Sequence, residues 1–227
     1  MIDVILIRTE DITPSIQTLW FRPEKPVRFI AGQFTELYLP HDDADERGTR
    51  RWFTISSSPT EELIGITTKF AAGDSSSYKR HLQALKPGAV LKMAEPMGDF
   101  VLPKNPSMPI LFVAGGMGIT PVRSMVKWLI DTGEQRNIRL LYIVNEPEDL
   151  AFQDVFRQYQ MEFMTYFTSQ NGRITAGQIA KMVTDDETLV YLSGPEQMVE
   201  TFYKQLQTHG ISSDRLAGDY YPGYPQP

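Results

Sequence analysis

Residues 110–121 read Ile-Leu-Phe-Val-Ala-Gly-Gly-Met-Gly-Ile-Thr-Pro, so that an apolar run of strand character passes into a glycine turn. An amphipathic segment follows the turn, with Val122, Met125 and Leu129 at helical spacing. We expect Thr120 to cap this helix, Pro121 to be its first residue and Gly133 to end it. A strand, a glycine turn and a helix together present backbone N–H groups to a phosphate.

The glycine turn therefore predicts a nucleotide phosphate site, with an ordinary strand–helix turn as the alternative. Glycines allow the chain to turn sharply and allow a ligand to approach the backbone closely. The turn departs from the Gly-x-Gly-x-x-Gly fingerprint of dinucleotide-binding folds, because Pro121 stands where the third glycine would fall.

The composition of the 227-residue chain excludes several kinds of site. The chain has no cysteine, which excludes disulfides, a cysteine nucleophile and an iron–sulfur cluster held by its own thiolates. Its three histidines, His41, His81 and His209, are scattered, so we expect no metal site. The net charge of −6 argues against nucleic acid and anionic membranes as partners. Without a basic leader or a long apolar run, the sequence predicts a cytoplasmic protein with no membrane span.

Short runs of strand character fill the first hundred residues. Alternating polarity and intervening turn residues predict strands at 4–8, 16–21, 34–39, 51–55, 63–69 and 90–93. A single short helix is expected at 77–85. One helix among six short strands predicts a six-stranded antiparallel β-barrel.

A proline-rich run at 102–109 separates this part from a different pattern, and we place the domain boundary there, with domains 1–104 and 105–227. Beyond it, helical periodicity alternates with apolar runs at 110–114, 138–144, 161–168 and 188–192. This alternation predicts an α/β domain with a doubly wound parallel sheet. Ligands of such sheets bind beyond the carboxyl ends of the strands, here the loops 115–121, 145–150 and 193–198.

Four motifs in order resemble those of the ferredoxin–NADP reductase family of flavoenzymes, and the resemblance covers nearly the whole chain. Arg51-Trp52-Phe53-Thr54 is similar to the family's Arg-x-Tyr-Ser flavin motif, and Gly73-Asp74-Ser75-Ser76-Ser77-Tyr78 to its Gly-x-x-Ser phosphate motif. Gly115–Pro121 is similar to its nicotinamide-nucleotide turn, and Ser193-Gly194-Pro195 to its Cys-Gly-Pro. The resemblance implies FAD in the barrel and NADH or NADPH in the second domain.

The resemblance implies that Arg51 pairs with the FAD pyrophosphate, although a solvated strand arginine is the alternative. Phe53 replaces the family's tyrosine and would stack on the flavin, and the Thr54 hydroxyl would lie near flavin N5. Ser76 and Ser77 would meet the pyrophosphate, with Ser77 also a plain helix N-cap. The other implied FAD-binding positions are Trp52, Thr67, Thr68, Lys69, Gly73 and Tyr78, although the threonines also suit an ordinary strand and Tyr78 an ordinary core position.

For the nicotinamide nucleotide, the resemblance places Thr120 and Ser193 beside the reacting rings, and together with Thr54 these are the implied catalytic positions. Ser193 would orient the ring and is no nucleophile, because no histidine lies near it in sequence. The implied nucleotide-binding positions are Gly115, Gly116, Gly118, Ile119, Thr120, Pro121, Asn145, Glu146, Ser193, Gly194, Pro195 and Met198.

The loop 145–149 carries three acids and no base, and a carboxylate at Glu146 accepts a ribose hydroxyl and repels a 2′-phosphate. We therefore favour NADH slightly over NADPH, although an acidic solvent-facing loop would look the same. Arg123 and Arg173 stay open as phosphate ligands from elsewhere in the chain.

The motifs together predict a flavoenzyme that transfers hydride from NADH or NADPH to FAD. Electrons then pass to a separate acceptor such as a ferredoxin, a flavodoxin, a quinone or another small acceptor. An electron-transfer subunit with little activity alone and a non-catalytic nucleotide sensor are the alternatives. Two further questions depend on the fold: whether Tyr221 or Tyr224 covers the flavin, and whether the basic residues Lys69, Lys79, Arg80, Arg50 and Arg51 share one face for an acidic redox partner.

Overall fold

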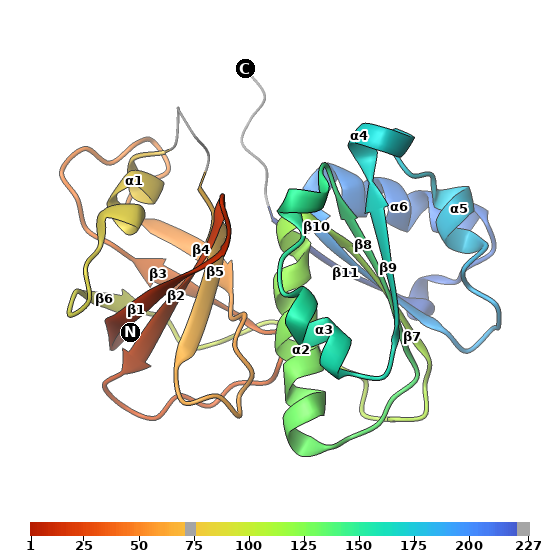
Figure 1. Ribbon diagram of the computed structural model, residues 1–227, viewed down its shortest axis with the longest axis horizontal. Helices are drawn as coiled ribbons and strands as arrows, with labels where there is room; N and C mark the ends of the chain where they lie inside the picture. Colours follow the sequence, from red (N-terminus) through yellow and green to blue (C-terminus); the bar gives the residue numbers. More distant parts are fainter. Residues whose placement is uncertain (71–75, 222–227) are drawn as a thin grey trace.

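The computed structural model describes residues 1–70 and 76–221, which form two adjacent domains (Figure 1). The first domain is a six-stranded antiparallel sheet in the order β4-β3-β6-β1-β2-β5. A bridge between Ile55 and Ile66 brings the two edges of this sheet together, so that it closes into the predicted barrel. Its elements are β1 (Ile2–Thr13), β2 (Ile16–Pro23), β3 (Phe34–Tyr38), β4 (Arg50–Thr54), β5 (Ile64–Lys69), α1 (Ser77–Ala84) and β6 (Val90–Met93).

Alternation of apolar and polar residues places one face of the barrel strands inside. In β6 the side chains of Leu91 and Met93 are buried while those of Val90 and Lys92 are not. The interior side chains form one cluster that includes Tyr78 and Leu82 of α1, so the helix closes part of the barrel. The predicted strands and the predicted helix of this domain are confirmed, with ends shifted by a few residues.

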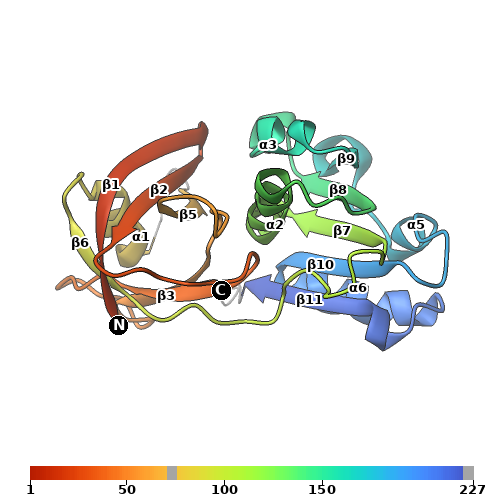
Figure 2. The ribbon, with the colours of Figure 1, turned by 90° about the horizontal axis from the view of Figure 1, so that it is seen from below.

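The second domain is a five-stranded parallel sheet in the order β11-β10-β7-β8-β9, with helices on both faces. β7 (Ile110–Gly115) lies in the centre and is buried throughout, which is why it reads as a continuous apolar run. Phe112 and Ala114 pack in the cluster of α2 and α3, whereas Leu111 and Val113 pack in that of α5 and α6. Figure 2 shows α2 between this sheet and the barrel. The predicted doubly wound α/β domain is confirmed.

The remaining elements of this domain follow the predicted alternation and add one strand. β11 joins the four predicted strands at the edge of the sheet, parallel to β10. The elements are α2 (Ile119–Thr132), β8 (Ile138–Val144), α3 (Gln153–Gln158), β9 (Glu162–Phe167), α4 (Thr168–Asn171), α5 (Ala176–Ala180), β10 (Leu189–Pro195), α6 (Glu196–Thr208) and β11 (Leu216–Tyr221).

The start of α2 differs from the prediction. A short 3₁₀ turn over Gly116–Gly118 leads directly into α2, which begins at Ile119 with Gly118 at the N-cap position. Thr120 lies inside the first turn and donates its hydroxyl hydrogen to the carbonyl oxygen of Met117 at 2.9 Å. The prediction that Thr120 caps the helix and Pro121 begins it was therefore wrong, because the chain turns helical earlier. The predicted end is confirmed, since Gly133 follows the helix with a left-handed φ of 73°.

The segment between the sheets is anchored on the second domain. The ring of Phe100 packs on that of Tyr191, whose hydroxyl donates to the carbonyl oxygen of Val101 at 2.8 Å. Arg136 donates to the carbonyl oxygen of Pro103 at 2.8 Å. The boundary between residues 104 and 105 stays a prediction.

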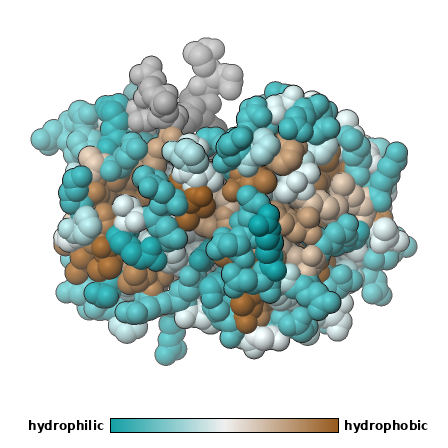
Figure 3. Space-filling model, viewed as in Figure 1, coloured by the Kyte–Doolittle hydropathy of each residue, from teal (hydrophilic) through white to brown (hydrophobic). Residues whose placement is uncertain are grey.

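Hydrophobic residues on the face seen in Figure 3 gather in separate patches among hydrophilic ones, over both domains. Within residues 1–70 and 76–221, no helix is both long and apolar enough to cross a membrane.

Candidate functional site

A cavity of about 790 Å³ opens where the barrel meets the second domain. Strands β3, β4 and β5 and the start of α1 line it from the barrel side, and the start of α2 and the end of β11 line it from the other. Its lining is Phe34, Glu36, Arg47, Arg50, Arg51, Trp52, Phe53, Thr54, Thr67, Thr68, Ser76, Lys79, Met97, Met117, Thr120, Asp219 and Tyr220. The volume is within the range of sites for cofactors and other small molecules.

Three of the four sequence motifs contribute directly to this cavity. The flavin motif supplies four consecutive residues of β4, the phosphate motif supplies Ser76, and the nucleotide turn supplies Met117 and Thr120. Thr67 and Thr68 of β5 line it as well, whereas their neighbour Lys69 pairs with Asp149 at 2.6 Å across the domain interface. Folding thus brings together segments that are far apart in the sequence, although the binding roles of their residues stay predictions.

Arg51 lines the cavity and also organises the loop before it. Its Nη2 donates to Asp45 Oδ1 at 2.8 Å, and its Nη1 donates to the carbonyl oxygens of Arg47, Gly48 and Arg50 at 2.7–2.8 Å. The side chain is only 11 % exposed, so it is not the solvated arginine of the alternative interpretation. The guanidinium therefore fixes the loop 45–50 along the wall of the cavity.

The start of α1 presents Ser76 rather than Ser77 to the cavity. Ser76 is the N-cap, and its hydroxyl oxygen accepts from the backbone N–H of Lys79 at 3.3 Å. The prediction of Ser77 as N-cap was wrong, because Ser77 is buried and its hydroxyl contacts His41 Nε2 and the N–H of Asp45, both at 3.1 Å. Gly73 of the same motif lies outside the described residues.

Tyr78 belongs to the barrel core. It is fully buried, its hydroxyl donates to the carbonyl oxygen of Leu37 at 3.1 Å, and burial raises its pKa. Phe53 and the guanidinium of Arg51 lie against its ring at centroid distances of 6.1 and 5.0 Å. Tyr78 thus supports two cavity residues from behind, while Trp52, 49 % exposed, packs edge-on against Phe34 at the mouth.

Ser193 meets a residue that the sequence analysis did not single out as a site residue. Strands β10 and β11 pair Ser193 with Asp219, and the Ser193 hydroxyl donates to Asp219 Oδ2 at 3.3 Å. Burial raises the pKa of Asp219 to about 6, the hydrogen bond from Ser193 lowers it, and the nearby Asp99 carboxyl raises it. Asp219 lines the cavity, so a carboxyl group whose pKa is raised by burial lies beside Ser193.

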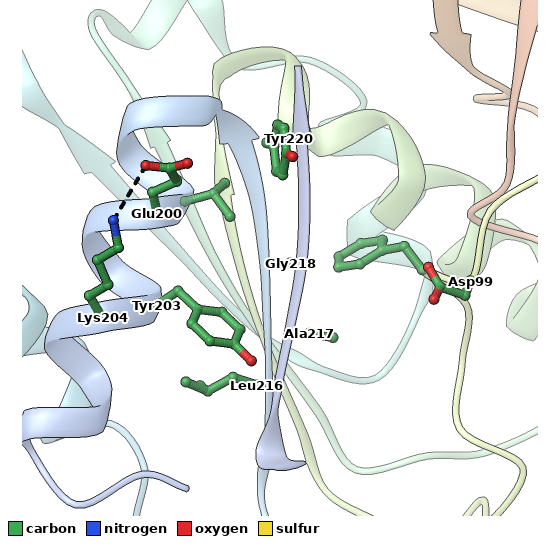
Figure 4. Close-up of a pocket in the computed structure, with 10 residues that line it drawn as sticks. Asp99, Glu200, Tyr203, Lys204, Leu216, Ala217, Gly218 and Tyr220 are labelled. Atoms are coloured by element: carbon green, nitrogen blue, oxygen red, sulfur yellow. Dashed lines mark ion pairs between the residues drawn. The ribbon is translucent and has the colours of Figure 1, made fainter. Parts of the chain in front are cut away.

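A second pocket of about 500 Å³ follows β11 and α6 (Figure 4). It is lined by Asp99, Phe100, Tyr203 and Tyr220 among others, and Lys204 pairs with Glu200 beside it at 3.6 Å. Tyr220 lines both pockets and therefore stands between them. Of the two tyrosines considered as flavin covers, Tyr224 lies outside the described residues, as does the side chain of Tyr221, and this possibility stays a prediction.

The nucleotide turn is packed tightly against β10. A Cβ atom on Gly118 would lie 2.1 Å from the Ser193 carbonyl oxygen, so the turn and the Ser-Gly-Pro motif touch backbone to backbone. Met198 covers the same place, because its Sδ would lie 2.5 Å from a Cβ on Gly115 and its Cε 2.7 Å from one on Gly194. Ile119 is buried beside them and Pro195 ends β10. The predicted nucleotide-binding loops therefore meet at the carboxyl end of the sheet.

Asn145 and Glu146 follow β8 at the same end of the sheet but do not line the cavity. Ser169 donates its hydroxyl hydrogen to Glu146 Oε2 at 2.9 Å, and Thr168 donates to Asn145 Oδ1 at 3.1 Å. The start of α4 thus holds both side chains in place, with the Glu146 carboxylate exposed beyond β8.

The predicted basic patch is divided. Arg50, Arg51 and Lys79 line the cavity together with Arg47, which the sequence analysis had not chosen. Lys69 is engaged with Asp149 at the domain interface, and Arg80 pairs with Asp43 at 3.1 Å on the exposed surface. Arg47 could have been found from its position four residues before Arg51. Phe34 and Glu36 offer no such signal, because only the fold brings these residues of β3 to the cavity.

Among the described residues, no group of three or more histidine, aspartate or glutamate side chains is placed to hold a metal ion.

Comparison with known proteins finds relatives of the second domain and of the chain as a whole. Residues 112–204 match the model of the oxidoreductase NAD-binding domain. A flavohemoprotein of Candida albicans is 32% identical over 176 residues, which are 70% of this chain and 42% of that protein. A glycine betaine monooxygenase reductase subunit of Chromohalobacter salexigens is 32% identical over 143 residues, 62% of this chain and 38% of that one. The chain thus spans less than half the length of these two relatives.

The solved structure of ferredoxin–NADP+ reductase from Plasmodium falciparum superposes with a TM-score of 0.80 at 16% identity, over 96% of this chain and 95% of that one. The barrel, the parallel sheet and the matched segment define a two-domain fold whose α/β domain matches an oxidoreductase NAD-binding domain. Within that class, the arrangement of the two domains is the fold of ferredoxin–NADP+ reductase.

Proposed function

We propose that this chain binds FAD in the cavity, takes up hydride from NADH or NADPH, and passes electrons to a separate acceptor. The observation that carries the proposal is the meeting of the flavin motif, the phosphate motif and the nucleotide turn around one cavity. The relatives support the same class of activity by their names, since one is a flavohemoprotein and another a reductase subunit. A cytoplasmic location stays a prediction.

The residues around the cavity fit a flavin dinucleotide. Its volume of about 790 Å³ accommodates a ring system, and Phe53 and the two β5 threonines offer an aromatic face and hydroxyl groups. Arg47, Arg51, Lys79 and the N-cap Ser76 gather positive charge and donors at the start of α1, where a pyrophosphate group would be held. Both the apolar part and the anionic part of the cofactor thus have partners of the right chemistry.

FAD, when bound, supplies a ring that accepts a hydride and releases electrons singly. The chain supplies position and electrostatics. Thr54 and Thr120, buried on opposite sides of the cavity, would orient the two nucleotides, and the turn at Gly116–Gly118 would hold the second pyrophosphate with its backbone N–H groups. Ser193 would orient Asp219 by donating to its Oδ2, and the carboxyl group of Asp219 would hold or release a proton close to the nicotinamide side.

The direct test is a visible spectrum of the purified protein followed by anaerobic titration with NADH and with NADPH. We expect the purified protein to be yellow or to take up added FAD. At least one of the two nucleotides should then bleach the flavin absorbance. A protein that takes up no FAD contradicts the proposal. Bound flavin that neither nucleotide bleaches supports the nucleotide sensor instead.

We propose NADH as the preferred nucleotide, because Glu146 sits at the end of β8 with its carboxylate fixed by Ser169. Glu146→Gln is expected to narrow the NADH preference about tenfold in kcat/KM, since removal of the charge relieves repulsion of a 2′-phosphate. Steady-state kinetics with both nucleotides measure this ratio. Glu148→Gln in the same loop serves as the control and should leave the ratio within about twofold. A wild-type preference for NADPH contradicts the assignment.

The pH dependence of stability tests the environment of Asp219. Its folded pKa of about 6 lies above the unfolded value of 3.8, so the folded state holds the proton at higher pH. The free energy of unfolding therefore falls as the pH rises from about 4 to about 6, and it stays lowered above that range. Asp219→Asn is expected to raise the unfolding free energy at pH 8 by roughly 1–3 kcal/mol and to change it little at pH 4. Denaturant unfolding at both pH values measures this, and equal effects at pH 4 and pH 8 contradict it.

A second candidate, an electron-transfer subunit with little activity alone, is favoured by the reductase subunit among the relatives. It predicts slow reduction of small acceptors that rises on adding the partner. Reduction of ferricyanide by the isolated chain, at a rate equal to the bleaching of its flavin, favours the independent reductase.

A further inference from the structure

The first turns of α2 are bound to the barrel as well as to their own sheet. Thr120 at the cavity is followed by Arg123 and Ser124, which are 7 % and 0 % exposed. Both face the segment 55–61, which begins directly after Thr54 of β4. The first turns of α2 therefore carry Thr120, which lines the cavity. They also carry Arg123 and Ser124, which attach the second domain to the segment that follows β4.

Arg123 makes a forked contact between the domains. Its Nη2 donates to Glu61 Oε1 at 2.9 Å, and its Nη1 donates to Glu61 Oε2 and, at 3.0 Å, to the carbonyl oxygen of Ser56. Glu61 is itself fixed, because its Oε2 accepts from the backbone N–H of Ser58 at 2.7 Å. This forked pairing of a buried guanidinium and a carboxylate fixes orientation as well as distance.

Ser124 extends the contact by one residue. Its hydroxyl donates to the carbonyl oxygen of Ser57 at 2.6 Å and accepts from the backbone N–H of Gly32 at 3.4 Å. A Cβ on Gly32 would lie 2.5 Å from Cε of Met125 in α2, so the barrel backbone approaches the other domain closely here. Ser124 therefore joins the main chain of the barrel domain directly to the helix.

Two aromatic rings enclose the guanidinium of Arg123. Trp20 of β2 lies 5.6 Å from it and Phe152, just before α3, lies 5.7 Å from it. Phe152 has a φ of 60°, a strained value for a residue other than glycine, and it is the one such residue in the described chain. Strain of this kind persists where packing holds it, often at functional sites. Both domains thus contribute to one rigid contact around Arg123.

We propose that Arg123 and Glu61 are positioning residues that set the angle between the domains, and so place the nucleotide turn relative to the flavin cavity. The inference rests on the proposed function. It also answers a question left open by the sequence, because the guanidinium of Arg123 is directed to the barrel and is engaged there, which leaves no role as a phosphate ligand.

The test compares Arg123→Met, Arg123→Lys and Glu61→Gln in the FAD-loaded protein. The rate of flavin bleaching at saturating nucleotide, measured anaerobically by stopped flow, is expected to fall about 10- to 100-fold for the methionine and glutamine variants, because small misplacements of reacting groups slow such steps strongly. The lysine variant keeps the charge without the fork and should fall between them and the wild type. FAD content and nucleotide Kd should stay close to wild type, which a mere loss of folding would not allow.

Thr60→Val is the matched control, since Thr60 donates to Asp131 Oδ2 at 2.5 Å in an exposed contact between the same segment and the far end of α2. It should change the bleaching rate less than about twofold. Bleaching rates of Arg123→Met and Glu61→Gln within that same range, in folded FAD-loaded protein, overturn the proposal.

A structural readout separates this proposal from the proposed function. The chain has no cysteine, so Val90→Cys and Lys204→Cys, one exposed position in each domain, can carry a pair of spin labels. Arg123→Met and Glu61→Gln are expected to broaden or shift the distance distribution, and Thr60→Val is not. Unchanged distance distributions overturn the proposed positioning role of Arg123 and Glu61 even if hydride transfer is observed. If neither nucleotide reduces the wild-type protein, the proposed function fails. The distances between the spin labels still test whether Arg123 and Glu61 set the angle between the domains.

Discussion

Gly118→Ala is expected to abolish reduction by nicotinamide nucleotides and to lower the unfolding free energy by about 3 kcal/mol or more. The new Cβ would lie 2.1 Å from the carbonyl oxygen of Ser193 and 2.6 Å from the backbone nitrogen of Gly194. These are main-chain atoms at the end of β10 that cannot turn aside, so either the turn or the strand must move. The backbone of Gly118, with φ −60° and ψ −5°, suits alanine, and the effect therefore comes from the clash alone.

Denaturant unfolding and anaerobic titration measure the two effects. Gly115→Ala is the matched control in the same turn, because its Cβ would meet the flexible side chain of Met198, whose Sδ lies at 2.5 Å. Met198 can rotate, so this variant should lose about 1 kcal/mol and keep measurable reduction. A Gly118→Ala protein with the stability and bleaching rate of the wild type contradicts the described packing of turn against strand.

Arg51→Ala is expected to weaken FAD binding about 100-fold and to leave the purified protein largely colourless. The variant loses a charge-assisted partner for the pyrophosphate and also releases the loop 45–50, which Arg51 holds through Asp45 and three carbonyl oxygens. The ratio of flavin to protein absorbance and the Kd for added FAD measure this. Arg80→Ala is the control, because Arg80 pairs with Asp43 of the neighbouring loop on the exposed surface.

The two roles of Arg51 give different outcomes. If the residue both binds FAD and orders the loop, the cofactor affinity and the stability of the FAD-free protein fall together. An Arg51→Ala protein that is less stable without FAD but binds the cofactor with wild-type affinity refutes the assigned contact with the pyrophosphate.

The local elements were largely predictable because their signals are short-range. Alternating polarity marked the barrel strands, and the continuous apolar run at 110–114 marked the buried central strand β7. Gly133 could be recognised as the end of α2, because a left-handed residue is needed there. The start of α2 was not predictable in the same way, because the 3₁₀ turn before it is packed against β10, which lies about 70 residues further along the chain.

The candidate site likewise contains residues that short-range signals predict and residues that they do not. Arg51 to Thr54 and Thr120 could be named from motifs, since each motif is a contiguous run. Asp219 could not, because its place beside Ser193 comes from the parallel register of β10 and β11. The role of Arg123 was equally hidden, since a helical arginine after a glycine turn suits a phosphate as well as a carboxylate, and only the approach of Glu61 distinguishes them.

The sequence by itself determined the type and order of the elements, the division into a barrel and an α/β domain, and the loops that gather at the carboxyl end of the parallel sheet. These follow from periodicity and turn chemistry, which act between neighbours in the chain. The tertiary structure alone decided which side chains share the cavity, that burial raises the pKa of Asp219, and that Arg123 binds the barrel. Those properties depend on burial and on contacts between distant segments, which arise only when the two domains pack together.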